Sequence, residues 1–497
     1  MARAPRVSVR RVPARVLVIG LDAADPGLVR GLAGADRLPN IASLLRERPG
    51  ARVMNPDGFY VGAVWPTLFT GTSPGHHGRT WPGRFHPGTY QVRPFEPSDL
   101  GAEPFWNALD RVGRRVAVVD VPHTRADPDL GVTQVVEWGA HDAAVGFQTS
   151  PSSLAGDLVA RFGRHPVDGC DRYGSQARYE QLARDLVHGV DRKAELTRFL
   201  LDQTDWDVFM VVFGESHCVG HQCWHLHDSH HPRHDAAVAG VTGDPVVDVY
   251  ERLDAALGHL LAGAAPDAEI LVLLSHGMGP HYDGSSLFID VLRRFEQAWD
   301  RQPSTWATTR DRLAHAWNRV ARRVRLRPSK TWVLDGSRQF FCAPNAGLCS
   351  AIRINVVGRE PAGVVAPGEE YEELGSTLEA ELLTLVNVET GKRAVRRVLR
   401  PAQMFDGPKV AQMPDLLVEW HQESPIRSLA SPTVGRVEGE YRGHRTGDHR
   451  RDGLLLRRGP TVARHTGDVI DARDLAPATC AFLDAPLPAA PSRPART

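Results

Sequence analysis

Three histidines of this chain could bind a single metal ion together. His217 and His221 lie four residues apart in FGESHCVGHQCWHLHD (residues 213–228), and His449 lies in TGDHRRDG (residues 446–453). On a helix, a spacing of four residues places two side chains on one face. Neutral imidazoles are good ligands for zinc, iron and manganese. The pattern predicts a metal site, and the alternative is a pair of solvated histidines in a polar loop.

Three further residues could take part in the same chemistry. Asp22 ends the apolar run VLVIGLD (residues 16–22), and His276 follows the apolar run ILVLLS (residues 270–275). We expect Asp22 and His276 to bind metal, or to act as a general base and acid beside a single ion. Glu215, two residues before His217, is a further candidate acid or base, with a plain loop carboxylate as the alternative.

Other histidines are candidates for binding the substrate. His123 lies in VPHT (residues 121–124), His141 in EWGAHD (residues 137–142) and His281 in GPHYDG (residues 279–284). Each lies in a polar segment near candidate ligands or after an expected strand, where an α/β protein binds its ligands. We expect these three to line a substrate pocket, and ordinary solvated loop histidines are the alternative.

The elements that must position these residues are short buried strands that alternate with helices. Helical spacing of apolar residues marks 153–162, 179–201 and 246–262, and the strands follow from short β-branched runs without alternation. The expected strands are Val16–Gly20, Val116–Val121, Val208–Phe213, Ile270–Leu274 and Leu416–Trp420. This order predicts an α/β fold with a mostly parallel central sheet and helices on both faces. Polar residues that follow the strands would then meet at one edge of the sheet.

Composition limits the class of protein. The 497 residues carry a formal net charge of zero, so nothing in the overall charge indicates binding to nucleic acid or to an anionic membrane. The apolar run near the basic N-terminus is too short for a signal segment or a membrane span. The six cysteines form no CxxC pair and are too sparse for a disulfide framework. We therefore expect reduced cysteines and a cytoplasmic location, and the oligomeric state stays open.

Four segments together resemble the alkaline phosphatase superfamily. They are VLVIGLDAADPGLV (residues 16–29), WPTLFTGTSPGHHG (residues 65–78), SHGMGP (residues 275–280) and GDHRRDGLLLRRGP (residues 447–460). Within it, the chain is similar to bacterial phosphohydrolases related to nucleotide pyrophosphatase/phosphodiesterase. The resemblance implies an alkaline-phosphatase-like catalytic domain over residues 15–484, with 283–345 as an inserted helical cap. Residues 1–14 would be a basic extension and 485–497 a disordered tail.

The same resemblance implies a site for two metal ions, with three departures. One ion would be held at positions 217, 221 and 449, where His217 replaces the Asp of the family pattern. The other would be held by Asp22, by Ser275 with His276, and by the nucleophile at position 61. Ser275 replaces an Asp, and Val61 replaces the Thr or Ser nucleophile. The cofactor expected is one or two divalent transition metals, zinc first, with manganese or iron as alternatives.

These departures change the expected mechanism. Three neutral histidines leave the full charge of a metal ion to act on bound water, whose pKa can fall to about 7. We therefore expect a metal-dependent hydrolase or transferase acting on a small anionic phospho-, sulfo- or phosphonate-type substrate. A metal-bound water, rather than a side-chain hydroxyl, would be the nucleophile. The alternatives are a catalytically degenerate binding protein and a biosynthetic tailoring metalloenzyme with non-hydrolytic chemistry.

Overall fold

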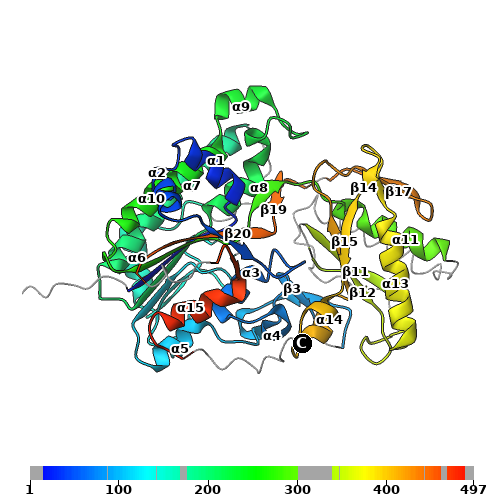
Figure 1. Cartoon of the computed structure of the whole chain (residues 1–497), viewed down its shortest axis with the longest axis horizontal. Helices are drawn as coiled ribbons and strands as arrows, with labels where there is room; N and C mark the ends of the chain where they lie inside the picture. The colour runs from blue at the N-terminus through cyan, green and yellow to red at the C-terminus, as the bar shows by residue number, and fades with distance from the viewer. Residues whose placement is uncertain are drawn as a thin grey trace, which may run out of the picture.

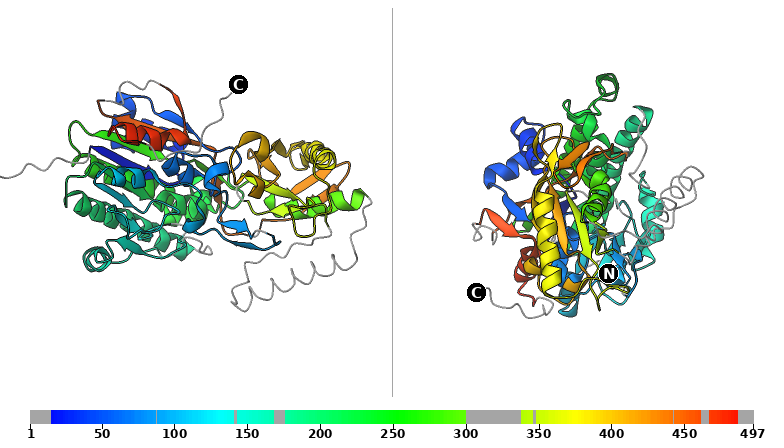
Figure 2. Two further views of the ribbon diagram at one scale, coloured as in Figure 1. Left: turned by 90° about the horizontal axis from the view of Figure 1, so that it is seen from below. Right: turned by 90° about the vertical axis from the view of Figure 1, so that its right-hand side faces the viewer.

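The protein consists of a large lobe and a smaller lobe that lie side by side (Figure 1). The computed structural model describes residues 15–86, 88–140, 143–167, 176–299, 338–345, 348–441, 443–460 and 467–486. The large lobe is built on a nine-stranded sheet, and the smaller lobe on two four-stranded sheets. The left view of Figure 2, seen from below, shows the two lobes arranged along the long axis of the molecule.

Three adjacent parallel strands form the centre of the large sheet. β1 (Val16–Leu21) lies between β8 (Val208–Phe213) and β9 (Glu269–Leu274), with Leu21 in register with both Phe213 and Leu274. All residues of these strands are buried. Strands covered on both faces need apolar residues throughout, which explains their uninterrupted apolar runs. The predicted fold class is confirmed.

Shorter strands complete the sheet on either side of this centre. β5 (Val116–Val119) and β6 (Thr133–Val136) continue the parallel part beyond β8. The remaining strands are β7 (Gln148–Ser150) at one edge and, beyond β9, β20 (Asp452–Arg458), β2 (Ala51–Met54) and β21 (Val469–Asp471). β7 and β20 are antiparallel to their inner neighbours, so the sheet is mostly parallel with mixed edges.

Helices cover both faces of the sheet, as alternating residues of β1 require. Leu17, Ile19 and Leu21 pack on one face and Val16 and Val18 on the other. The first face is covered by α1 (Pro26–Gly34), α2 (Pro39–Glu47), α6 (Leu154–Phe162), α7 (Gln176–Leu201), α8 (Glu215–His227) and α10 (Pro245–Leu261). The second face is covered by α3 (Val64–Thr70), α5 (Phe105–Arg111) and α15 (Leu475–Ala481). Figure 1 shows these two groups on opposite sides of the sheet.

The smaller lobe has its own core. β11 (Phe340–Ala343), β12 (Cys349–Ile354), β16 (Leu416–Trp420) and β15 (Val395–Leu399) form one antiparallel sheet, which packs with α11 (Ser285–Ala298) and α13 (Glu369–Leu383). The second sheet consists of β14 (Lys392–Arg393), β13 (Val386–Asn387), β17 (Ser428–Ser431) and β18 (Gly435–Glu438).

Two sequence-based expectations concern this lobe. The strand expected at Leu416–Trp420 forms with those bounds, but it pairs antiparallel with β12 and β15 instead of joining the parallel sheet. A short apolar run does not specify its partner strand. Of the segment 283–345, expected as a helical cap, the described part includes α11 and β11, and residues 300–337 lie outside the described residues. The expected boundaries of the cap, the extension 1–14 and the tail 485–497 stay predictions.

One disulfide adjoins the candidate metal ligands. Cys218, next to His217 in α8, is disulfide-bonded, so the expectation of reduced cysteines is wrong at this position. Four other cysteines are free (Cys223, Cys342, Cys349 and Cys480), and Cys170 lies outside the described residues. Pairing depends on distance in the fold, which the spacing of cysteines in the sequence does not give.

None of the described helices combines the length and the apolar character that crossing a bilayer would require.

Candidate metal centre

Three imidazoles converge at the carboxyl edge of the large sheet. His217 and His221 lie on α8, which begins directly after β8. His449 lies on β19 (Gly447–His449), and its pairing with Met278 of β10 (Met278–Pro280) brings it from the C-terminal part of the chain. The Nε2 atom of His217 is 3.0 Å from Nε2 of His221 and 2.9 Å from Nε2 of His449. The structure therefore brings together the three residues predicted to share one ion, all of them buried.

The other ring nitrogens show where the protons lie. Nδ1 of His217 is 2.7 Å from a carboxylate oxygen of Asp22, and Nδ1 of His221 is 2.7 Å from the carbonyl oxygen of Gly447. Both partners are acceptors, so the Nδ1 atom of each ring is the donor in its contact. The Nε2 atoms of His217 and His221 then face each other 3.0 Å apart, an arrangement that a shared cation would stabilise.

The cluster fits a divalent transition metal. Zinc bound to histidine at about 2.0–2.1 Å with tetrahedral angles places the nitrogens about 3.3 Å apart, close to the observed 2.9 and 3.0 Å. Histidine ligands in metal sites also donate their second N–H to a carboxylate or carbonyl, as His217 and His221 do here. The donor set is thus suited to zinc, iron or manganese.

Asp22, predicted as a metal ligand, lies behind His217 and outside the group of three. One of its oxygens accepts from His217, and the other accepts from Trp65 Nε1 at 2.7 Å and from Ser275 Oγ at 2.9 Å. Gly20 makes room for the indole, since a Cβ there would lie 2.6 Å from the Trp65 ring. Burial acts to raise the pKa of Asp22, but the neighbouring His217 lowers it well below its ordinary value. Asp22 is therefore an ionised carboxylate whose two oxygens already have donors.

The positions of the family's missing carboxylate and nucleophile lie beside Asp22. Ser275 donates to Asp22 and accepts from the backbone N–H of Ala23 at 3.1 Å. Val61 lies in the wall of a cavity of about 20 Å³, which Asp22, His217 and His276 also line. Such a volume holds about one water molecule. Val61, at the position of the nucleophile in the family pattern, therefore faces the site but offers no hydroxyl.

Neighbouring hydroxyl groups point to other partners. Thr67 Oγ1 is 3.0 Å from Nε2 of the buried His77, and Tyr60 donates to Asp57 at 2.8 Å. Neither Thr67 nor Tyr60 lines the cavity that contains Val61. In the described residues, neither hydroxyl takes the place of the missing nucleophile.

His276 faces the same cavity as Val61 and His217. Its Nδ1 lies 3.3 Å from the carbonyl oxygen of Gly277, and its Nε2 lies 3.8 Å from Asp22. Burial lowers the pKa of His276 to about 4, so the ring is neutral at pH 7. With its proton directed toward Gly277, Nε2 is left as an acceptor.

Glu215 lies in a buried charge cluster rather than in the wall of this cavity. It is 3.0 Å from His165 and 3.4 Å from Lys193, whose ammonium is also 3.0 Å from Asp120. Asp120 accepts from the backbone N–H groups of Trp138 and Gly139. The cluster therefore ties the start of α8 to the loop after β6.

Sequence reasoning missed Lys193 and Asp120 in this cluster. Asp120 directly follows the apolar run of β5, just as Asp22 directly follows β1. This shared position at the end of a strand could have identified Asp120 from the sequence. No comparable signal marks Lys193, because it lies within the long helix α7 among ordinary charged residues.

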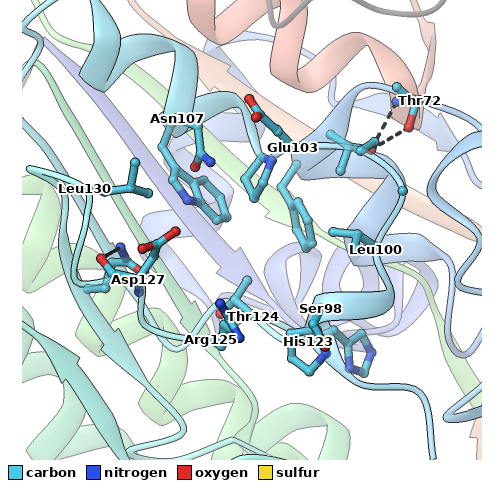
Figure 3. A pocket seen from close by; sticks show the side chains of 18 of the residues that line it. Thr72, Ser98, Leu100, Glu103, Asn107, His123, Thr124, Arg125, Asp127 and Leu130 are labelled. Carbon is cyan, nitrogen blue, oxygen red and sulfur yellow. Dashed lines mark hydrogen bonds between the residues drawn. The ribbon is translucent and has the colours of Figure 1, made fainter.

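His123 lies in the wall of two cavities. It lines the cavity of about 20 Å³ with His276, and it also lines a larger one of about 690 Å³ beside α5. Figure 3 shows the larger cavity with His123 at one end and Asn107, Asp127 and Leu130 across from it. Nδ1 of His123 lies 2.9 Å from the guanidinium of Arg79. His123, predicted to line a substrate pocket, is thus placed between the metal cluster and the larger cavity, whereas His141 lies outside the described residues.

His281 belongs to a second polar group next to β19. Its Nε2 is 2.8 Å from Asp283 and 3.7 Å from Asp448, the residue before His449. Burial acts to lower the pKa of His281, but Asp283 and Asp448 raise it to about 9. His281 is therefore a protonated partner of two carboxylates, and it does not line the cavity that contains His276.

Arg445 is a further residue that the sequence reasoning did not identify. Its Nη1 lies 3.3 Å from Nε2 of His221, on the rim of the three-imidazole cluster. The available signal was its position four residues before His449, but nothing in that spacing shows where a long side chain points.

The model of the type I phosphodiesterase / nucleotide pyrophosphatase family matches residues 16–390. No curated protein matches the chain in sequence.

Solved structures resemble the whole described fold. Phosphonoacetate hydrolase from Sinorhizobium meliloti 1021 in complex with phosphonoformate is 14% identical, and the alignment covers 95% of this chain and 96% of that one, with a TM-score of 0.53. The same enzyme with phosphonoacetate gives the same values. Murine ectonucleotide pyrophosphatase / phosphodiesterase 5 is 12% identical over 95% of this chain and 96% of its own, with a TM-score of 0.47. At 14% identity, the match to the hydrolase establishes a shared fold and leaves the substrate open.

Proposed function

This chain belongs to the type I phosphodiesterase / nucleotide pyrophosphatase family, whose members are hydrolases of the alkaline phosphatase superfamily, and we propose that it works with a single metal ion and without a covalent enzyme intermediate. The substrate class is a small anion with a phosphoryl, phosphonyl or sulfuryl group. The observation that carries this proposal is the set of converging Nε2 atoms of His217, His221 and His449.

Those three Nε2 atoms would hold the proposed ion. A divalent ion on three imidazoles would lower the pKa of water to about 7 and so would supply a nucleophile near neutral pH. Asp22 and the Gly447 carbonyl hold the Nδ1 protons of His217 and His221, which keeps both Nε2 lone pairs directed at the cluster. Asp22 would therefore act on the ion through His217 rather than as a ligand of a second ion.

His276 is the proposed proton acceptor. Its neutral ring and its Nε2 lone pair face the cavity in which the reacting group would lie. It would take up a proton from the attacking water and release it to the leaving group. Glu215, bound to Lys193 and His165, is proposed to support the loop after β6 and to transfer no proton.

The absence of a covalent intermediate is proposed from Val61 and its neighbours. Val61 cannot attack, and the hydroxyls of Thr67 and Tyr60 are bound to His77 and Asp57. None of the described residues that line the cavity is a Ser, Thr, Cys, Lys or Tyr, which supports direct attack by water. The rest of the substrate would extend past His123 toward the cavity of about 690 Å³.

Location is a separate question from mechanism. The cytoplasmic location stays a prediction, and the disulfide at Cys218 weighs against it, because disulfides persist mainly in oxidising compartments.

The test of this function compares metal-free and reconstituted protein on four substrate classes: phosphate monoesters, phosphate diesters, sulfate esters and phosphonates. We expect at least one class to be hydrolysed after addition of zinc or manganese and not in excess chelator. His221→Ala should be inactive, while His230→Ala, which changes an exposed histidine, should retain full activity.

Acid quenching during turnover, followed by intact-protein mass measurement, tests the nucleophile. The proposal expects unmodified protein at all times. A phosphorylated or sulfated enzyme residue would contradict it. Metal bound without turnover of any class would favour the binding-protein alternative, for which Val61 is the supporting observation.

A further inference from the structure

Lys193 is a buried cation that lies behind the wall of the cavity of about 20 Å³ and does not line it. Its ammonium is 3.0 Å from Asp120 and 3.4 Å from Glu215. It also donates to the carbonyl oxygens of Gly139 at 3.1 Å and Val212 at 3.2 Å. Burial acts to lower the pKa of Lys193, but the two carboxylates raise it above its ordinary value. The ammonium is therefore charged and surrounded by carboxylate and carbonyl oxygens.

Most partners of Lys193 belong to the wall of that cavity. Asp120, Gly139 and Val212 line it together with His217. Lys193 thus binds three separate segments of the wall at once: the residue that follows β5, the loop after β6, and β8. A wall built from three segments keeps its shape only as well as those segments are held together, and Lys193 contacts all three.

The backbone of Asp120 shows that this wall is held in place against a local cost. Its φ is 53°, in the left-handed region that residues other than glycine rarely adopt and that persists only where surrounding contacts hold it. Its N–H donates to the carbonyl of Val135 at 2.7 Å. Its carboxylate accepts from the N–H groups of Trp138 and Gly139 and faces Lys193. The side chain of Asp120 is therefore part of what fixes the direction of the chain after β5.

Glu215 connects Lys193 to the candidate metal ligands. It is the first residue of α8, and His217 lies two residues later in the same turn. Oε1 of Glu215 faces Lys193 and His165, whereas the buried Oε2 has no hydrogen-bond partner in the described residues. Without the ammonium, this buried carboxylate would lose its main counter-charge and would be driven toward another donor. Any shift of Glu215 would carry His217 with it.

We propose that Lys193 is a positioning residue of the metal centre. It touches neither the ion nor the substrate. It holds the cavity wall through Asp120 and the first turn of α8 through Glu215, and so keeps His217 in place among the three imidazoles. This inference rests on the proposed function, because it concerns the same ion, and it adds a residue from α7 to the groups on which that ion depends.

The test measures cobalt(II) binding to tag-free, full-length protein, by competition with a chelator of known affinity and by the visible spectrum of the bound ion. Wild type is compared with Lys193→Met and with Lys193→Met combined with Glu215→Gln. The double variant removes one positive and one negative charge and so keeps the net charge of the cluster. Leu186→Ala is the matched control, because Leu186 is a buried core residue of the same helix whose truncation lowers stability by leaving a cavity. Urea denaturation is measured for every variant.

We expect Lys193→Met to bind cobalt about 10-fold more weakly than wild type, at the lower end of the range for residues that orient metal ligands indirectly, and with an altered visible spectrum. The double variant should regain part of the stability and none of the affinity. Leu186→Ala should lose stability and keep the affinity of wild type.

Cobalt affinity within about twofold of wild type in either variant of Lys193 would overturn the inference. So would a loss of affinity in Leu186→Ala as large as in Lys193→Met, since the loss would then follow stability alone. If Lys193→Met does not fold, the double variant decides by the same criterion. Wild-type protein that binds no cobalt would contradict the proposed metal centre itself, and the inference with it.

Discussion

The two sides of His217 differ in what their polar atoms face. On one side, its Nε2 and the Nε2 atoms of His221 and His449 point at one another within about 3 Å, and two of these rings have their protons placed elsewhere. On the other side, the Asp22 carboxylate has hydrogen-bond donors at both oxygens, among them Ser275. The first side offers three nitrogen atoms that a cation would bind, and it is called the cation-binding side below. The second side is complete without a cation.

The difference supports the proposal that this chain retains one half of the two-metal site implied by its resemblance to the superfamily. A serine at position 275 can donate to Asp22 and accept from Ala23 at once, which an ionised aspartate could not do. His217 then joins the two sides, because one nitrogen faces Asp22 and the other faces the cluster. A site with these contacts is expected to hold one ion.

The largest effect is expected from removing one of the three imidazoles on the cation-binding side. His221→Ala should lower metal affinity by more than about 100-fold, beyond the 10- to 100-fold that indirect partners contribute. Metal content after dialysis should fall to background, and the apparent metal-dependent rise in Tm should vanish. Retention of metal by this variant would place the ion elsewhere.

Adding a carboxylate beside Asp22 should make that side of His217 require a cation. Ser275→Asp puts a second carboxylate against Asp22, which Ser275 now contacts at 2.9 Å. In excess chelator we expect a loss of about 3 kcal/mol in unfolding free energy at pH 7, since one buried charge is left uncompensated. Added zinc should restore stability and raise the metal content toward two per chain. If this variant is as stable in chelator as Ser275→Ala, the reasoning about this side is wrong.

Asp22→Asn tests the connection between the two sides. An amide does not fix the Nδ1 proton of His217 as a carboxylate does, so metal affinity should fall about 10- to 100-fold while one site remains. Competition with a chelator of known affinity measures the change. Asp254→Asn, a buried aspartate that binds Asn40 and Ile41, is the control and should leave metal affinity unaltered.

The smallest effect is expected from Ser275→Ala. It removes one hydrogen bond to Asp22 and one from Ala23, and should reduce the unfolding free energy by about 1–2 kcal/mol. Metal content should stay at one ion per chain, measured together with urea denaturation. A loss of metal would show that Ser275 contributes to the cation-binding side.

Much of the fold follows from local patterns in the sequence. The apolar runs at β1, β8 and β9 identify strands buried on both faces, and the polar residues that follow them meet at one edge. β16 was assigned correctly as a strand but to the wrong sheet, because an apolar run carries no information about its neighbours. The disulfide at Cys218 was missed for the same reason, since its partner is set by the fold.

The candidate site was less predictable than the fold. The spacing of His217 and His221 and the position of His449 were sufficient to bring the three together as a hypothesis. The contacts of Glu215 with Lys193, and of Arg445 with His221, depend on where long side chains point. Spacing along the chain does not encode those directions, so both residues required the three-dimensional arrangement.

Elemental analysis of the protein purified without a histidine tag tests the central claim most directly. His217→Ala provides the control, because it removes the residue that joins the two sides. We predict about one divalent transition metal per chain in the wild type and none in the variant. Two ions per wild-type chain, or no ion at all after reconstitution, would contradict a site built around one metal.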